Sequence, residues 1–207
     1  MGPNSAAAMT DLDSQFDAAY YDRFYRNPRT RVTSPDERGR LLALAIAVLR
    51  HQEVDVRKIL DAGCGLGYSR APLLRAFPDA TYTGLEVSEY LCRKYGWTQA
   101  SVVDYRARAR FDFVLCSDVV QYLSDRDAAR AINNLARLCR GVLFFHTPTR
   151  EDLSELVDAK GSDVNVHFRP AQWYRKRLGV HFHHLGFGLH LARKHEPLQW
   201  TLAQPSA

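Results

Sequence analysis

The sequence predicts an α/β fold: a three-layer sandwich with helices on both faces of a mostly parallel sheet. From residue 56 onward, short apolar runs alternate with amphipathic segments, which is typical of parallel strands joined by right-handed helical crossovers. The last stretch, residues 180–193, instead has the pattern of two short strands about a Gly-x-Gly turn. At 207 residues the chain is long enough for one domain with a substantial core.

Local signals place the individual elements. Ser34, Pro35 and Glu37 form a capping box that starts a helix ending at about residue 51. We expect further helices at residues 69–77, 88–95, 125–139 and 171–178. We expect strands at residues 57–61, 80–86, 100–103, 111–116 and 141–146, and a loop at residues 151–168.

Composition divides the chain into three parts. Residues 1–10 have the character of a tag-like or disordered leader, residues 11–35 carry a dense aromatic cluster, and residues 36–207 form a single domain. Within the cluster, aromatic residues recur at a spacing of four, as in an amphipathic helix that packs on the body of the protein.

Charge and composition exclude several classes of protein. The net charge is +5, but the basic residues are scattered, which favours a solvated surface over a nucleic-acid interface. No apolar run approaches the roughly 18 to 20 residues needed to cross a bilayer. The four cysteines are widely spaced without a C-x-x-C pair, so we expect neither a disulfide framework nor a metal, and a cytoplasmic location. His181, His183 and His184 sit on a predicted hairpin without other metal ligands at suitable spacing.

A glycine-rich turn follows the first predicted strand. Gly63, Gly65 and Gly67 alternate, and such glycines let the backbone bend sharply and approach a ligand closely. The spacing is G-x-G-x-G and not the G-x-G-x-x-G of dinucleotide-binding proteins. Asp61 at the mouth of the turn repels a phosphate and attracts an ammonium group. We therefore expect a zwitterionic or cationic ligand.

A second acid ends the next predicted strand. Glu86 lies about 20 residues after the glycines, where a carboxylate accepts hydrogen bonds from both hydroxyls of a ribose. With both acids in place, residues 36–195 resemble the class I, Rossmann-like S-adenosylmethionine-dependent methyltransferases. The resemblance implies that the Asp61 to Gly67 loop holds the methionine end of S-adenosylmethionine and that Glu86, followed by Val87, holds the ribose. It also implies seven strands, an antiparallel C-terminal hairpin and S-adenosylhomocysteine as product.

Further contacts with the cofactor are expected at the ends of later strands. Asp104 is a candidate acceptor for an adenine amino group, with Tyr105 beside the ring, although an exposed turn aspartate is an equally good interpretation. Ser117 and Asp118 match the segment after the fourth strand that lines the cofactor in the family. This segment lacks the N/D-P-P-Y/F sequence of many nucleic-acid amino methyltransferases.

Candidate catalytic and substrate residues lie outside the glycine loop. His146 ends a central strand and His167 precedes the last helix, so both are candidate general bases. Arg169 is a candidate partner for an anionic substrate group. The resemblance implies a lid formed by the aromatic segment, with Tyr21 and Tyr25 as its candidate contacts with cofactor or substrate.

The sequence thus predicts an enzyme that methylates oxygen, nitrogen or sulfur of a small metabolite or natural product, as a monomer or homodimer. Three alternatives remain open at this point: an NAD(P)-dependent oxidoreductase, a non-catalytic S-adenosylmethionine-binding domain, and an RNA methyltransferase. The glycine spacing and Asp61 oppose the first alternative.

Overall fold

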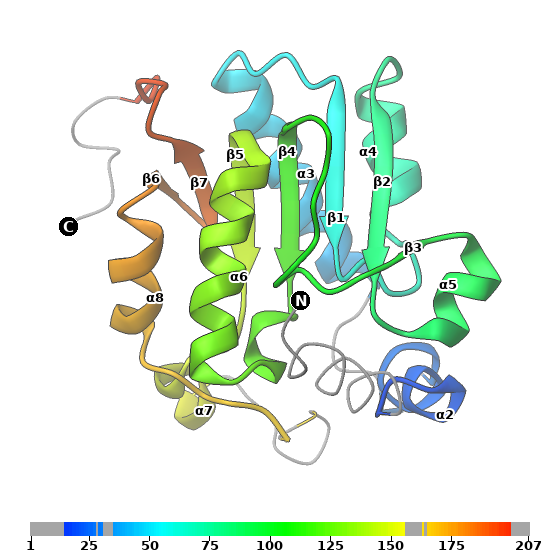
Figure 1. Ribbon diagram of the computed structural model, residues 1–207. Coiled ribbons are helices and arrows are strands. Elements are labelled where there is room, and N and C mark those ends of the chain that lie inside the picture. The colour runs from blue at the N-terminus through cyan, green and yellow to red at the C-terminus, as the bar shows by residue number, and fades with distance from the viewer. Residues whose placement is uncertain (1–14, 28, 31–34, 156–162, 164, 200–207) are drawn as a thin grey trace.

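The computed structural model describes residues 15–27, 29–30, 35–155, 163 and 165–199. Its centre is a seven-stranded sheet in the order β3-β2-β1-β4-β5-β7-β6, with helices on both faces (Figure 1). This architecture confirms the predicted fold class. The predicted leader at residues 1–10 lies outside the described residues, as does the capping residue Ser34.

The strands are parallel except at the C-terminal end, where β7 runs antiparallel to both of its neighbours. This arrangement confirms the expected hairpin. The strands are β1 (Lys58–Ala62), β2 (Thr81–Glu86), β3 (Thr98–Gln99), β4 (Phe111–Ser117), β5 (Cys139–His146), β6 (Phe182–Gly186) and β7 (Leu189–Ala192).

The predicted helices are present, and none of their ends is shifted by more than one residue. The α-helices are α2 (Ala18–Tyr21), α3 (Pro35–His51), α4 (Arg70–Ala76), α5 (Glu89–Tyr95), α6 (Asp125–Leu138), α7 (Arg150–Glu155) and α8 (Ala171–Leu178). The aromatic segment continues from α2 into a π-helical turn, η1 (Asp22–Arg26), and a 3₁₀ turn, η2 (Val120–Tyr122), follows β4. The short helix α7 begins what was predicted to be loop over residues 151–168.

Two apolar layers hold the sheet between the helices. Successive strand residues point to opposite faces, so Ile59 packs with Leu49 of α3 and Leu73 of α4, whereas Leu60 belongs to the layer that contains Leu135 of α6. All of these side chains are fully or almost fully buried. The strands are thereby packed on both faces. The residues at the strand ends are held in place for the same reason.

The third strand differs from the prediction. Residues 100–103 were expected to be extended, but the strand comprises only Thr98–Gln99. The chain turns at Ser101, because its side-chain oxygen accepts from the Val103 N–H at 3.2 Å and its carbonyl accepts from the Tyr105 N–H at 2.9 Å. Serine competes in this way with strand hydrogen bonding. The prediction of a strand at 100–103 was therefore wrong.

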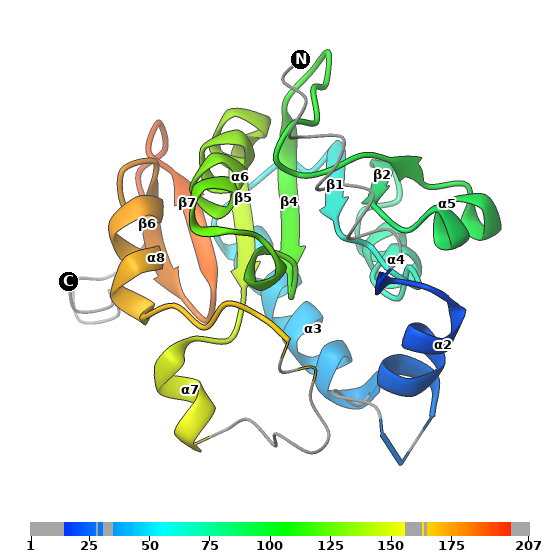
Figure 2. The ribbon, with the colours of Figure 1, turned by 60° about the horizontal axis from the view of Figure 1, so that its bottom comes forward.

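The strand order reverses between β1 and β4, since the chain first builds outward to β3 and then returns to the other side of β1. Ligands of open α/β sheets bind at the carboxyl ends of the strands at such a switch point. Figure 2 brings this edge forward, with α2, α3 and α7 arranged around it. Among the described residues, none of the helices combines the length and the apolar character that a membrane span requires.

Candidate active site

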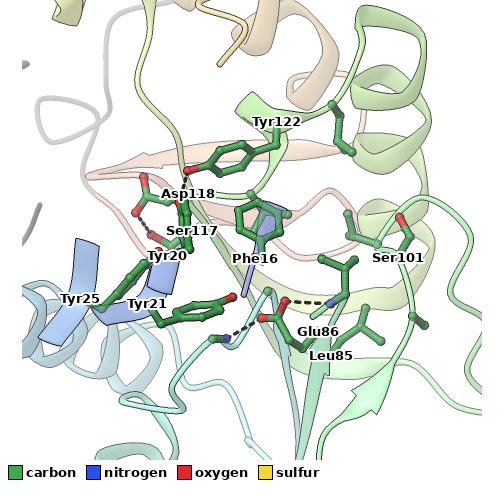
Figure 3. A pocket seen from close by; sticks show the side chains of 17 residues that line it. Phe16, Tyr20, Tyr21, Tyr25, Leu85, Glu86, Ser101, Ser117, Asp118 and Tyr122 are labelled. Atoms are coloured by element: carbon green, nitrogen blue, oxygen red, sulfur yellow. Dashed lines mark hydrogen bonds between the residues drawn. The ribbon is translucent and has the colours of Figure 1, made fainter. Parts of the chain in front are cut away.

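A cavity opens at the carboxyl ends of β1, β2 and β4, and encloses about 660 Å³ of empty space, part of it open to solvent (Figure 3). Its lining comes from five stretches of chain, namely Phe16, Tyr20, Tyr21 and Tyr25; Gly63 and Gly65; Leu85, Glu86 and Val87; Ala100, Ser101 and Val102; and Ser117, Asp118, Val119, Tyr122 and Leu123. The aromatic N-terminal segment thus covers the ends of the strands.

The glycine loop makes a tight bend beneath this cavity. Gly63 has a φ of +80°, and a Cβ at this position would lie 2.2 Å from Cγ2 of Val119, so only glycine fits. The N–H groups of Gly63 and Cys64 both donate to the Leu85 carbonyl, at 2.8 and 3.0 Å, and the Gly65 N–H donates to Glu86. Because these groups are already bonded, the loop does not present them to a pyrophosphate.

Glu86 is the most firmly fixed polar side chain of the cavity. Its Oε2 accepts from the Gly65 N–H at 2.8 Å, and its Oε1 accepts from the N–H groups of Val87 at 2.8 Å and Ser88 at 3.1 Å. Burial raises the pKa of Glu86, while these three donors act in the opposite direction. A carboxylate has about four acceptor positions, so Glu86 keeps capacity for a ligand hydroxyl.

Asp61 lies at the end of β1 but is not part of the cavity lining. Its side chain is buried, and its Oδ2 accepts from the Tyr82 hydroxyl at 2.6 Å. Burial raises the pKa of Asp61 to about 6, since the bond from Tyr82 offsets desolvation only in part. Asp61 is thus bonded to Tyr82 of β2 and to the Ser69 side chain, which precedes α4. Gly67 also lies off the cavity, packed against the Trp97 ring.

The residues expected beside an adenine are displaced. Asp104 forms an ion pair with Arg130 at 2.7 Å, and the Tyr105 side chain packs against the core of the α6 face. Neither lines the cavity; Ala100, Ser101 and Val102 do so instead. The turn at Ser101, which replaces the predicted strand, is the reason for this shift along the chain.

The ends of β4 and β5 bring two titratable groups together. Asp118 has a φ of +58°, a conformation that aspartate tolerates better than most residues, and its N–H donates to the His146 carbonyl at 2.8 Å. Asp118 Oδ2 accepts from the Ser117 hydroxyl at 2.9 Å, and Oδ1 lies 3.7 Å from His146 Nδ1. The Asp118 carboxylate raises the pKa of His146. Ser117 and Asp118, predicted as cofactor contacts, line the cavity, whereas His146, predicted as a general base, lies beside it.

The two candidates from the segment after α7 are not placed in the cavity. His167 is exposed, and its backbone N–H donates to the Gln121 carbonyl at 2.8 Å. Arg169 is buried, and its guanidinium donates to the carbonyls of Val120 and Leu123, to the Tyr174 hydroxyl and to Asp125. With its donors engaged in this way, Arg169 is a structural cross-link, and its prediction as a substrate contact was wrong.

Comparison with known proteins finds a family model that matches the part of the chain around this cavity. Residues 60–141 match the family model described as a methyltransferase domain, a range that runs from the middle of β1 into β5 and includes the glycine loop and Glu86. This part of the chain, less than half of its length, resembles the methyltransferase domain. The resemblance inferred from Asp61, the glycines and Glu86 is thereby confirmed.

The chain also resembles a curated methyltransferase over part of its length. It is 30% identical over 107 residues to a trans-aconitate 2-methyltransferase of an Azoarcus species, an alignment that covers 47% of this chain and 42% of the relative. The chain thus spans less than half of the length of the curated relative that it matches.

Two solved structures share the fold. One is magnesium protoporphyrin IX methyltransferase of Synechocystis, with a TM-score of 0.62, 19% identity, and coverage of 83% of this chain and 87% of that one. The other is a sugar N-methyltransferase of a Streptoalloteichus species, with a TM-score of 0.57, 21% identity, and coverage of 83% and 91%. At these identities the likeness concerns the fold.

The aromatic N-terminal segment is tied to the site by its own hydrogen bonds. The Ser88 hydroxyl donates to the Phe16 carbonyl at 2.6 Å, and the hydroxyls of Tyr20 and Tyr122 are 2.8 Å apart. Tyr21 and Tyr25, predicted as contacts, do line the cavity, together with Phe16 and Tyr20, which sequence reasoning assigned to packing. The spacing of four between Phe16 and Tyr20 was the signal in the sequence that both lie on one face of the segment.

The residues present fit S-adenosylmethionine on chemical grounds. Glu86 presents a fixed carboxylate with spare acceptor capacity for a ribose hydroxyl. Gly63 and Gly65 leave the loop without side chains where the ligand would approach. The N–H groups of Gly63, Cys64 and Gly65 are bonded within the protein, as suits a ligand that carries no phosphate.

Proposed function

We propose that this chain is an S-adenosylmethionine-dependent methyltransferase that acts on a small metabolite or natural product. The observation that carries the proposal is Glu86, a carboxylate held by three backbone donors on the wall of a cavity. In the adjacent loop the N–H groups of Gly63, Cys64 and Gly65 are already bonded within the protein. An NAD(P)-dependent enzyme needs such donors for its pyrophosphate.

The cofactor supplies, when bound, a methyl group on a positively charged sulfur. In the proposed mechanism Glu86 binds the ribose, Ser101 and Val102 face the adenine, and the loop at Gly63 and Gly65 accommodates the methionine end. Tyr21 and Tyr25 cover the cavity and exclude water. Holding two reacting groups at attack distance in a dry pocket accounts for much of the rate in such reactions.

A neutral oxygen or nitrogen acceptor must also lose a proton. Asp118 lies on the cavity wall and His146 lies beside it, with His146 exposed at the outer side. In the proposed mechanism this pair takes the proton from the acceptor and passes it to solvent. Proton transfer of this kind contributes about 10²- to 10⁴-fold in rate.

Calorimetry tests the proposal directly. We expect the protein to bind S-adenosylhomocysteine and not NADH. Glu86→Gln should weaken binding of S-adenosylhomocysteine at least tenfold, about 1.4 kcal/mol, because an amide is a poorer acceptor and its NH₂ opposes the backbone donors. Glu196→Gln, the same change at an exposed position, is the matched control and should leave the affinity unchanged.

Transfer of a labelled methyl group to a pool of metabolites then separates an enzyme from a binding domain. Binding of NADH, or equal affinity of the Glu86→Gln variant and the unchanged protein for S-adenosylhomocysteine, would contradict the proposal. Tight binding without transfer to any acceptor in the pool would favour the non-catalytic alternative.

A further inference from the structure

The charged side chains in the described lining of the cavity are all negative. Among the residues that the structure describes there, the charged members of the lining are Glu86 and Asp118, both carboxylates. A third carboxylate, Asp163, accepts a hydrogen bond from the Tyr20 hydroxyl at 3.2 Å. Arg38 lies over the Tyr25 ring at 5.8 Å but does not belong to the lining. An anionic acceptor would enter against these carboxylates and find no lining cation opposite.

The two lining acids differ in what they can still bind. Glu86 is buried and accepts from three backbone donors, whereas Asp118 is about half exposed and accepts from Ser117 at one oxygen. The left-handed backbone of Asp118, with its N–H bonded to the His146 carbonyl, fixes where this carboxylate stands. Non-glycine residues in this conformation cluster at functional sites.

Aromatic rings surround the same part of the cavity. Tyr20 and Tyr25 stand with their centroids 6.3 Å apart, and the Tyr20 hydroxyl is joined to that of Tyr122. Figure 3 shows these rings and Asp118 around one end of the cavity, with Glu86 toward the other. Ring faces attract cations, and the attraction is larger where water is excluded. Carboxylates combined with aromatic walls are complementary to an ammonium group.

We propose that the methyl acceptor is an amine, which binds as an ammonium ion between Asp118 and the tyrosine rings. This inference rests on the proposed function and names its substrate class. Before transfer, one proton leaves the nitrogen for the Asp118 carboxylate and passes to His146, which releases it to solvent. The freed nitrogen lone pair forms the new N–C bond as the carbon–sulfur bond breaks, and the electron pair of that bond stays on sulfur.

Three probes of similar shape test the proposal: 2-phenylethylamine, 2-phenylethanol and 3-phenylpropanoate. Each is titrated by calorimetry into protein saturated with S-adenosylhomocysteine. We expect the amine to bind at least tenfold more tightly than the alcohol or the carboxylate. In Asp118→Asn this preference should fall below threefold, because the amide keeps the left-handed turn but carries no charge. Asp79→Asn, an exposed aspartate before β2 at the opposite edge of the sheet, is the control and should keep the preference.

The outcomes separate this proposal from the one on which it rests. Failure to bind S-adenosylhomocysteine refutes the methyltransferase function. Normal binding of that compound, with equal affinity for the three probes, with no binding of any probe, or with preference for the carboxylate, overturns the amine proposal alone. An amine preference that survives in Asp118→Asn overturns the role of Asp118. The variant's own affinity for S-adenosylhomocysteine, expected within twofold of the unchanged protein, excludes misfolding as the cause.

Discussion

The site is built from two halves that are held in different ways. The cofactor half, formed by the ends of β1 and β2 with the glycine loop, is fixed by backbone donors and by burial of Asp61 and Glu86. The acceptor half, formed by the ends of β4 and β5 and the segments that follow, is fixed by the long-range side chain of Arg169, which donates to backbone carbonyls, and by the bond from the Asp118 N–H to the His146 carbonyl. From this difference we expect cofactor affinity to depend on the cofactor half and the choice of methyl acceptor to depend on the acceptor half.

The largest effect is expected where one side chain holds the acceptor half together. Arg169 donates to the carbonyl of Val120, the first residue of η2, to the carbonyl of Leu123, directly after η2, and to the hydroxyl of Tyr174 in α8. Arg169→Ala removes the donor to the buried Leu123 carbonyl and Tyr174 hydroxyl and should lower the free energy of unfolding by about 3 kcal/mol. Urea denaturation measures this change.

A matched variant separates the cross-link from the loss of an arginine in general. Arg175→Ala, at an exposed position of α8, should change the stability by no more than about 0.5 kcal/mol. If Arg169→Ala were equally mild, η2 would be held by its own turn, and the acceptor half would be as self-supporting as the cofactor half.

A smaller effect, on rate alone, is expected at His146. His146→Asn should lower kcat about tenfold, about 1.4 kcal/mol, and leave the affinity for S-adenosylhomocysteine unchanged. Because Asp118 raises the pKa of His146, the residue accepts a proton only above that raised pKa, so the activity should increase as the pH rises through it. The pH profile of kcat tests this, and in His146→Asn the rising limb should flatten.

The control for this variant is His195→Asn, because His195 is exposed and its ring nitrogen contacts the Arg140 carbonyl, before the apolar part of β5. An unchanged pH profile in His146→Asn would leave Asp118 alone as the proton acceptor. Each half of the site would then depend on one carboxylate, Glu86 in the cofactor half and Asp118 in the acceptor half.

The same division explains how far the sequence could predict the site. Glu86 and the glycines were predictable because a strand, a turn and a helix follow each other within the chain, and burial and backbone geometry act locally. Arg169 was assigned the wrong role because its acceptors at Val120 and Leu123 lie more than 40 residues away in sequence. Asp104 was displaced for a local reason, the turn at Ser101, which strand propensity alone does not reveal.

The smallest expected effect tests whether the ionised, buried carboxylate of Asp61 lowers the stability of the cofactor half. Burial raises the pKa of Asp61 from 3.8 to about 6, so the folded state binds this proton more tightly than the unfolded chain does. Stability from Asp61 is therefore lost as the pH rises from about 4 through 6, and above pH 7 the ionised, buried group is a cost. Asp61→Asn keeps an acceptor for the Tyr82 hydroxyl and should raise the free energy of unfolding by about 1 kcal/mol at pH 8.

This gain should vanish at pH 5, where Asp61 of the unchanged protein is mostly protonated, and Asp55→Asn, at an exposed position, should show no such pH dependence. Urea denaturation at the two pH values provides the measurement. If the more stable Asp61→Asn variant also binds S-adenosylhomocysteine more weakly, the charge is retained for binding at the expense of stability. If the variant is less stable at pH 8, the hydrogen bond from Tyr82 to the ionised carboxylate outweighs its desolvation. The charge of Asp61 would then stabilise the cofactor half.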